Sequence, residues 1–124
     1  MDEVNQIDID DPEVGGDLNG RITYRGQLYT GEAIEYGPDG HRIALTNFTD
    51  GVKDGIEKEW YPDGSPLMEG MSKHGSAVGE WRQWFPDGRL KQLNVFDDKG
   101  RHLSRKIWDE NGNLIKDYSS SDPR

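Results

Sequence analysis

Histidine is the side chain best suited to proton transfer or metal binding near neutral pH, and this chain has three. His41, His74 and His102 lie far apart in the sequence, in or beside glycine-containing segments. A zinc site normally draws ligands from closely spaced residues, and the chain has no cysteine to supply a thiolate. The pattern predicts exposed turn histidines, no metal or other cofactor, and no enzymatic activity.

The carboxylates do not form a recognisable catalytic or calcium-binding motif either. Asp8, Asp10 and Asp11 are spaced like the start of a calcium loop, but the glycine and the distal glutamate of that motif are missing. A second group of aspartates stands between a proline and a glycine, where turn chemistry explains them: Asp39, Asp63 and Asp87.

These turns recur at one spacing, which indicates a repeat protein. The tripeptide Pro-Asp-Gly occurs three times and Glu-Asn-Gly takes its place once, so that four glycines lie 24 residues apart. An aromatic residue precedes each turn in the same phase. The predicted structural positions of the repeat are Tyr36, Trp60, Trp84, Trp108, Gly40, Gly64, Gly88 and Gly112.

Each repeat predicts two strands joined by a tight turn. In the third copy an aromatic-rich segment 79–85 precedes Pro86-Asp87-Gly88, the signature of a three-residue hairpin loop with a glycine bulge. Gly and Pro interrupt the chain too often for a helix of three turns. We therefore predict an all-β fold, an antiparallel β-meander of about eight to ten short strands in sequential order, with no substantial helix.

The aromatic column predicts how the hairpins are held together. We expect the in-phase rings to lie side by side as a ladder, with Tyr61, Trp81 and Phe85 on the opposite face. A basic column shares the face of the ladder: Lys58, Arg82 and Lys106, with Ile34 in the first copy. We favour a structural role for these basic residues over nucleic-acid binding, because the repeats carry no positive field.

Charge divides the chain into an acidic segment and a nearly neutral body. The net charge is −9, and residues 1–17 contain seven acidic and no basic residues. We predict an acidic lead-in over 1–17 with a short strand within 5–10, a repeat domain over 18–118 with four 24-residue repeats from about residue 31, and a frayed tail over 119–124. Such a lead-in is either a solvated segment or a contact for a basic partner. The N-terminus lacks the basic start and apolar stretch of a secretory signal, so we expect a cytoplasmic protein.

The repeat unit, seen best in 55–64 and 79–88, resembles the MORN repeat variant, and residues 24–118 resemble the YwqK-like antitoxin family. The resemblance implies an immunity protein that neutralises a toxin made by the same bacterium. If that toxin acts on nucleic acid, its cleft is basic and carboxylates could occupy it. The alternative is a repeat scaffold for other proteins and, with less support, for a membrane surface.

The expected partner is thus a protein toxin with a basic surface, with no direct binding of nucleic acid or membrane. Pairing of exposed sheet edges into a dimer remains open. The predicted partner-binding residues come from the lead-in, the charged strand of the second repeat and the aromatic patch: Asp8, Asp10, Asp11, Glu13, Glu57, Glu59, Tyr61, Trp81 and Phe85.

Overall fold

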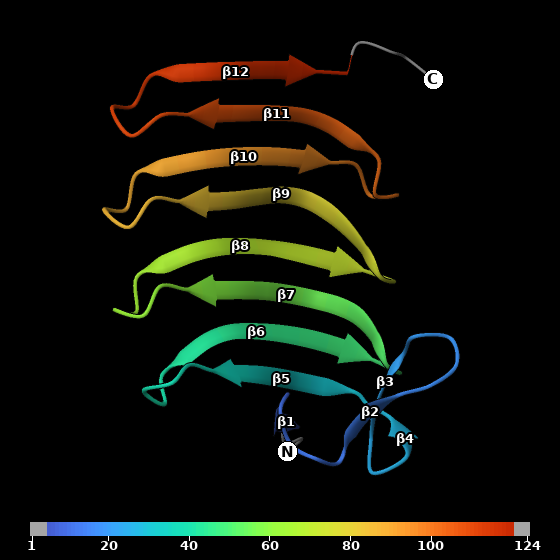
Figure 1. Cartoon of the computed structure of the whole chain (residues 1–124). Coiled ribbons are helices and arrows are strands. Elements are labelled where there is room, and N and C mark those ends of the chain that lie inside the picture. Colours follow the sequence, from blue (N-terminus) through green and yellow to red (C-terminus); the bar gives the residue numbers. More distant parts are fainter. Residues whose placement is uncertain (1–4, 121–124) are drawn as a thin grey trace, which may run out of the picture.

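The computed structural model describes residues 5–120, which form twelve strands and no helix. Nine strands make one sheet in the order β1-β5-β6-β7-β8-β9-β10-β11-β12 (Figure 1). Their bounds are β1 Gln6–Asp8, β5 Gly31–Tyr36, β6 Arg42–Thr49, β7 Val52–Trp60, β8 Pro66–Lys73, β9 Ser76–Trp84, β10 Leu90–Phe96, β11 His102–Trp108 and β12 Leu114–Ser119. The predicted all-β meander and its sequential order from β5 onwards are confirmed.

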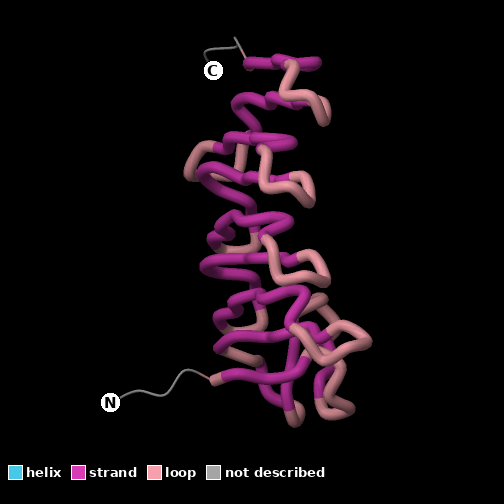
Figure 2. Tube along the Cα trace, turned by 90° about the vertical axis from the view of Figure 1, so that its left-hand side faces the viewer, coloured by secondary structure: helices cyan, strands magenta, loops and turns pink. Residues whose placement is uncertain are grey.

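The sheet is a single curved layer with its first and last strands at opposite ends (Figures 1 and 2). β1 lies parallel to β5 and every other pair is antiparallel. Part of the acidic segment therefore belongs to the sheet. It forms the edge strand β1, which is the short strand predicted within 5–10. At the other end Ser119 and Ser120 still bond to β11 and Leu103, while 121–124 of the predicted tail lie outside the described residues.

A second sheet covers the β5 end of the stack. It consists of β2 Val14–Gly16, β3 Ile22–Tyr24 and β4 Gln27–Leu28. Gly15 and Gly16 of β2 pair with Thr23 and Ile22 of β3. The two sheets are joined by backbone bonds from Ile22 N–H to Gly51 O and from Gly51 N–H to Tyr29 O.

Three of the four buried apolar residues among residues 5–120 lie near the small sheet, and the fourth, Val78, lies farther along the large sheet in β9. The buried apolar residues of the described chain are Tyr29, Ala33, Ile34 and Val78. The Tyr29 ring contacts Tyr24 and Phe48 edge-on, at centroid distances of 6.1 and 6.5 Å, and its hydroxyl donates to Glu32 O at 2.7 Å. Beyond this end most strand residues are only half-buried, so the later repeats depend on strand pairing and partial side-chain cover.

The Pro-Asp-Gly turns adopt the predicted geometry. In the second copy Gly64 N–H donates to Tyr61 O and Tyr61 N–H donates to Ser65 O, each at 2.8 Å, and Gly64 has φ +90°. The same pair of bonds and a left-handed glycine recur in the other three copies. The register shifts just after each turn, which leaves one extra residue on the returning strand: Ile43, Leu67, Lys91 and Ile115.

The aromatic ladder, in contrast, does not form. The four in-phase aromatics lie on alternate strands, so an intervening strand separates each from the next. Their cross-strand partners are Arg42, Pro66, Leu90 and Leu114. No ring contact joins two members of this column among residues 5–120. The prediction overlooked that a 24-residue repeat contains two strands, which places equivalent residues about 9.6 Å apart.

Cross-strand pairing defines two faces of the sheet. The row on face A is Ile34, Leu45, Lys58, Glu69, Arg82, Leu93, Lys106 and Asp117. This confirms that the basic column shares one face. The register also inserts Glu69 between Lys58 and Arg82 and sets Asp117 beside Lys106, so these charges alternate in sign rather than forming a positive stripe. The described residues contain no helix long and apolar enough to span a membrane.

Aspartate side chains fix several turns by accepting backbone hydrogen bonds. Asp97 Oδ1 accepts from the N–H groups of Lys99 and Arg101 at 2.9 and 2.8 Å. The bond from Arg101 N–H is the main reason why the pKa of Asp97 is lowered, with further lowering by the Arg101 side chain and by Lys99 N–H. Asp17 and Asp109 make the same kind of turn, and their pKa values are lowered for the same reason.

This geometry predicts a pH-dependent contribution from Asp97. Because its pKa is lower in the folded state, its stabilising effect is present above the unfolded value of about 3.9 and is lost as the pH falls through the folded value. We expect Asp97→Ala to lower the melting temperature at pH 7 and to differ less from the parent protein near pH 2. Asp98→Ala, in the same turn, is the control and leaves the melting temperature unchanged. An Asp97→Ala deficit of equal size at both pH values contradicts the assignment.

Candidate interaction surface

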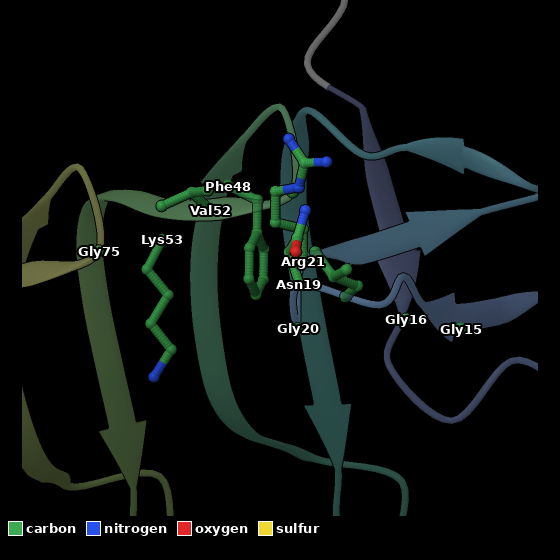
Figure 3. A pocket seen from close by; sticks show the side chains of 11 residues that line it. Gly15, Gly16, Asn19, Gly20, Arg21, Phe48, Val52, Lys53 and Gly75 are labelled. Atoms are coloured by element: carbon green, nitrogen blue, oxygen red, sulfur yellow. The ribbon is translucent and has the colours of Figure 1, made fainter.

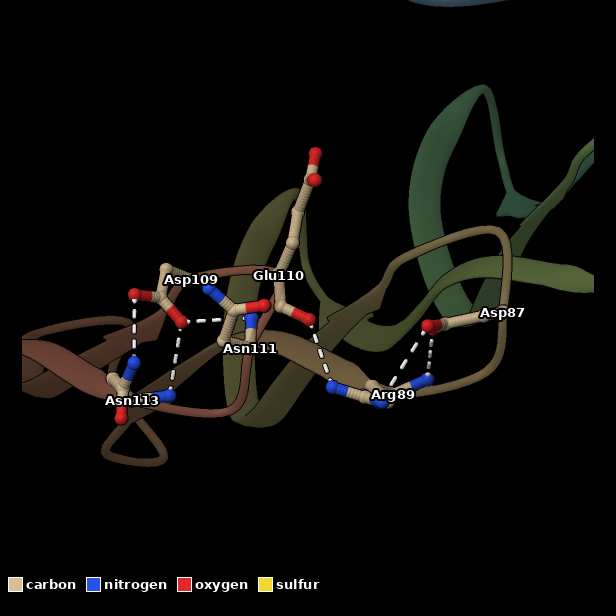
Figure 4. Close-up of polar contacts among 6 residues, drawn as sticks. All are labelled: Asp87, Arg89, Asp109, Glu110, Asn111 and Asn113. Atoms are coloured by element: carbon tan, nitrogen blue, oxygen red, sulfur yellow. Dashed lines mark hydrogen bonds and ion pairs between the residues drawn. The ribbon is translucent and has the colours of Figure 1, made fainter.

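The third and fourth hairpin turns, which lie at the same ends of their strands, are linked to each other. Arg89 pairs with Asp87 of its own turn at 3.5 Å and donates through Nη1 to Glu110 O of the next turn at 2.8 Å (Figure 4). Asp109 accepts from the backbone of Asn111 and Asn113 at 2.9 and 3.0 Å. These polar groups bond to one another within and between the two turns, which stabilises the turn conformations.

The predicted acidic contacts fall into two groups once their partners are known. Glu13 forms an ion pair with Arg25. Asp11 accepts from Glu13 N–H at 2.8 Å and lies 3.5 Å from the Tyr24 hydroxyl. Asp8 and Asp10 are exposed, and Asp8 accepts from Asp10 N–H at 2.8 Å. The carboxylates of Asp8 and Asp10 are therefore the members of this group that face solvent without an ion pair in the described structure.

Glu57 does not fit the predicted role as a partner contact. Its exposed fraction is 7%, its carboxylate accepts a hydrogen bond from Ser72 Oγ, and Lys53 Nζ lies 3.6 Å away. A buried carboxylate with these partners holds β7 and β8 together. The sequence pattern missed this because Glu57 and Glu59 look equivalent in the sequence. The strand register distinguishes them, since it places Gly70 beside Glu57 and Met68 beside Glu59.

The predicted aromatic patch lies on face B, the opposite side of the sheet from the Lys58 row. The Trp81 ring covers Gly70 and donates through Nε1 to Met71 O at 3.0 Å. Tyr61 donates its hydroxyl to Trp84 O at 2.6 Å and so bridges two repeats. Phe85 has Lys91 Nζ 5.7 Å from its ring centroid. All three rings are half-buried, which leaves part of each surface available for contact.

The acidic group and the aromatic patch are separate surfaces. β1, which carries Asp8, and β9, which carries Trp81, are five strand steps apart in the sheet, or about 24 Å at the usual inter-strand spacing. A partner that touches both must span most of the sheet. Glu59 lies between them on face B, in the row Glu35, Ala44, Glu59, Met68, Gln83, Gln92, Ile107 and Lys116.

That row reveals a feature that sequence reasoning missed. Face B carries carboxylates toward β5 and cationic side chains toward β12, where Arg105 and Lys116 lie in neighbouring rows. The sequence shows only mixed charges in this region, and the pattern becomes visible when the register of the last hairpin is applied. The Asp109–Gly112 turn sets that register. The charge pattern could therefore have been predicted by assigning side chains alternately to the two faces along both strands, starting from this turn.

A hollow of about 460 Å³ lies between the small sheet and the large one (Figure 3). Its lining contains five glycines and two cationic side chains, Arg21 and Lys53. Arg21 forms an ion pair with Asp17 at 2.8 Å, and Lys53 forms one with Glu57. Both positive charges are therefore paired with carboxylates of the same chain. Residues 5–120 contain no group of three or more His, Cys, Asp or Glu side chains arranged to hold a metal ion.

The fold and its surfaces define an open repeat sheet, and the comparisons identify one of its units. Residues 53–74, which include most of the β7–β8 hairpin, match the family model of the MORN repeat variant. No curated protein matches the chain. The finer resemblance to YwqK-like antitoxins therefore stays a prediction.

Two solved structures are similar in shape. One is a crystal structure of TarM, with a TM-score of 0.42 and 12% identity over 87% of this chain. The other is a point mutant of TarM from S. aureus in complex with fondaparinux, alpha-GlcNAc-glycerol and UDP, with a TM-score of 0.42 and 13% identity over 86% of this chain. This chain spans about a fifth of each, at 20% and 19% of their lengths.

The contact between Trp81 and Gly70 can be tested by adding one methyl group at Gly70. A Cβ at Gly70 would lie 2.1 Å from Trp81 Cδ2, so Gly70→Ala must displace the ring or the strand. We expect a loss of about 1–3 kcal/mol in the free energy of unfolding, measured by urea denaturation and tryptophan fluorescence. Gly16→Ala is the control, because its Cβ would meet nothing closer than Arg21 O at 3.7 Å. Equal stability of the two variants would show that the ring does not rest on Gly70.

Proposed function

We propose that this MORN-repeat β scaffold works by protein–protein contact, as an immunity protein that neutralises a bacterial toxin with a basic surface. The observation that carries the proposal is the openness of the sheet. Most of its strand residues are half-buried or exposed, and the small sheet covers only the β5 end (Figure 1). Broad faces with half-buried aromatic side chains suit contact with another protein.

The toxin is the finer part of the proposal, and two features support it. The first is the resemblance of the repeats to an antitoxin family. The second is the exposed acidic surface at the β1 end, where Asp8 and Asp10 face solvent. Carboxylates of this kind accelerate association with a basic partner through long-range attraction. In this proposal the protein acts in the cytoplasm, has no catalytic activity of its own and binds neither nucleic acid nor membrane directly.

The alternative function is a repeat scaffold that brings together other proteins. Its support is the same open sheet together with the repeat match over 53–74. A membrane surface is a weaker partner, because anionic lipids require clustered basic residues and the basic row of face A is interrupted by Glu69 and followed by Asp117.

The toxin proposal predicts protection and salt-dependent association. We expect co-expression of this chain to restore growth of cells that express the toxin domain encoded beside its gene, and the two purified proteins to bind. Asp8→Asn/Asp10→Asn should slow association about tenfold at low salt and have little effect at high salt, because screening removes the attraction. Asn retains an oxygen for the turn bond of Asp8, so the fold is preserved.

The matched control is Asp98→Asn/Asp117→Asn, which removes the same charge from the other end of the sheet and should leave the association rate close to that of the parent protein. If both double variants bind at the parent rate at low salt, the acidic end has no part in recognition. If the chain neither protects nor binds, the toxin proposal is wrong and the scaffold remains, to be pursued by cross-linking in cells, with vesicle co-sedimentation as the test for lipid.

A further inference from the structure

The last two strands, β11 and β12, bring four side chains together around a hollow on face B. His102, Arg105, Lys116 and Tyr118 line a space of about 270 Å³. Arg105 pairs with Tyr118 across β11 and β12, while Lys116 comes from the next row. None of these residues belongs to the acidic group or to the aromatic patch discussed above. The hollow is therefore a separate feature of the surface.

Three of the four side chains of this hollow, His102, Arg105 and Tyr118, contact other side chains of the sheet. Asn94 Oδ1 accepts from Arg105 Nε at 2.9 Å and lies 2.9 Å from His102 Nε2. Because a carbonyl oxygen only accepts, His102 must carry its proton on Nε2. The His102 ring also stacks on Tyr118, with centroids 5.8 Å apart and planes inclined by 3°, and contacts Phe96 at 5.2 Å. His102, Arg105 and Tyr118 are therefore positioned before any ligand arrives.

The positive charge of this hollow is not neutralised within the described chain. Neither Arg105 nor Lys116 has a carboxylate within ion-pair distance among residues 5–120. The register places Asp117 on face A, opposite Lys106, and the facing positions of β10 are the neutral Gln92 and Asn94. Two uncompensated cations side by side repel each other, and a bound anion would relieve that repulsion. They lie in neighbouring rows of one face although the whole chain has a net charge of −9.

We propose that this hollow binds the phosphate group of a small phosphorylated molecule. With Nε engaged by Asn94, the guanidinium of Arg105 still has its terminal N–H groups to donate, and Lys116 adds an ammonium group. The Tyr118 hydroxyl is a further donor, and this residue is 48% exposed. A dianion with three acceptor oxygens matches two cations and a hydroxyl better than a single carboxylate does, and the open side of the hollow leaves room for the organic part.

The test is an NMR titration of the full chain with inorganic phosphate and with phenyl phosphate, with ionic strength held constant by chloride. We expect saturable shifts of the His102 imidazole and Tyr118 ring signals, while His41 and His74 serve as internal references that do not shift. Arg105→Gln should weaken binding about tenfold or more, since it removes a charge-assisted hydrogen-bond donor. Arg82→Gln is the control: it removes the same charge from face A, where Arg82 pairs with Glu80 at 2.6 Å, and should leave binding unchanged.

A second variant guards against an indirect effect, because Arg105→Gln also alters the bond to Asn94. Lys116 is exposed and its side chain makes no hydrogen bond in the described structure, so Lys116→Gln should weaken binding about fivefold without changing the melting temperature. Equal shifts of all three histidines, or unchanged affinity in both variants, overturn the proposal. A lipid source would also overturn it. In that case neither free phosphate nor phenyl phosphate shifts the His102 signals, but the protein co-sediments with phosphatidic acid vesicles and Lys116→Gln abolishes this binding. Toxin binding is scored separately, so the two proposals fail independently.

Discussion

The left-handed glycine that closes each Pro-Asp-Gly or Asp-Glu-Asn-Gly turn is the constraint on which the rest of the sheet depends. Its φ of +85 to +92° lets the chain reverse within three residues, and the extra residue that follows fixes the register of the returning strand. A slip by one residue would exchange the two faces. The buried pairing of Glu57 with Ser72 requires the register that the Pro62-Asp63-Gly64 turn sets. The joint contact of Arg105 and His102 with Asn94 depends in the same way on the Asp97–Gly100 turn, which joins β10 to β11.

Stability is distributed unevenly because the sheet is a single layer. At the β5 end the small sheet covers the large one, and Ile34 is fully buried there. Toward β12 no second layer from residues 5–120 covers the strands (Figure 2), so strand pairing and turn hydrogen bonds carry more of the stability. Solenoid-like repeats that contact only their neighbours behave in this way. β12 is exposed along its whole length, and Lys116 and Asp117 on it disfavour edge-to-edge aggregation.

The sequence was sufficient to predict the elements that local chemistry determines. Pro, Asp and Gly at fixed positions define the turns, and the turns define the meander. The predicted contacts that failed depend on which strands are neighbours. The aromatic column repeats every 24 residues, but its members lie on alternate strands. Trp84 on β9 therefore pairs with Leu90 on β10, and β10 separates it from Trp108 on β11. Glu57 reads as a surface charge until the strand register sets it beside Gly70. Strand adjacency is a non-local property, and periodicity in one dimension does not reveal it.

The same reasoning explains why the charge pattern of face B escaped notice. Net charge assigned by segment treats 18–118 as nearly neutral, but side chains alternate between faces, so charges adjacent in sequence are separated in space. Lys116 and Asp117 follow one another in the chain and lie on opposite faces. One face thereby becomes acidic toward β5 and cationic toward β12, although the whole chain is acidic. A repeat sheet can thus carry two chemically distinct surfaces on a uniform scaffold, one suited to a basic protein and one to an anion.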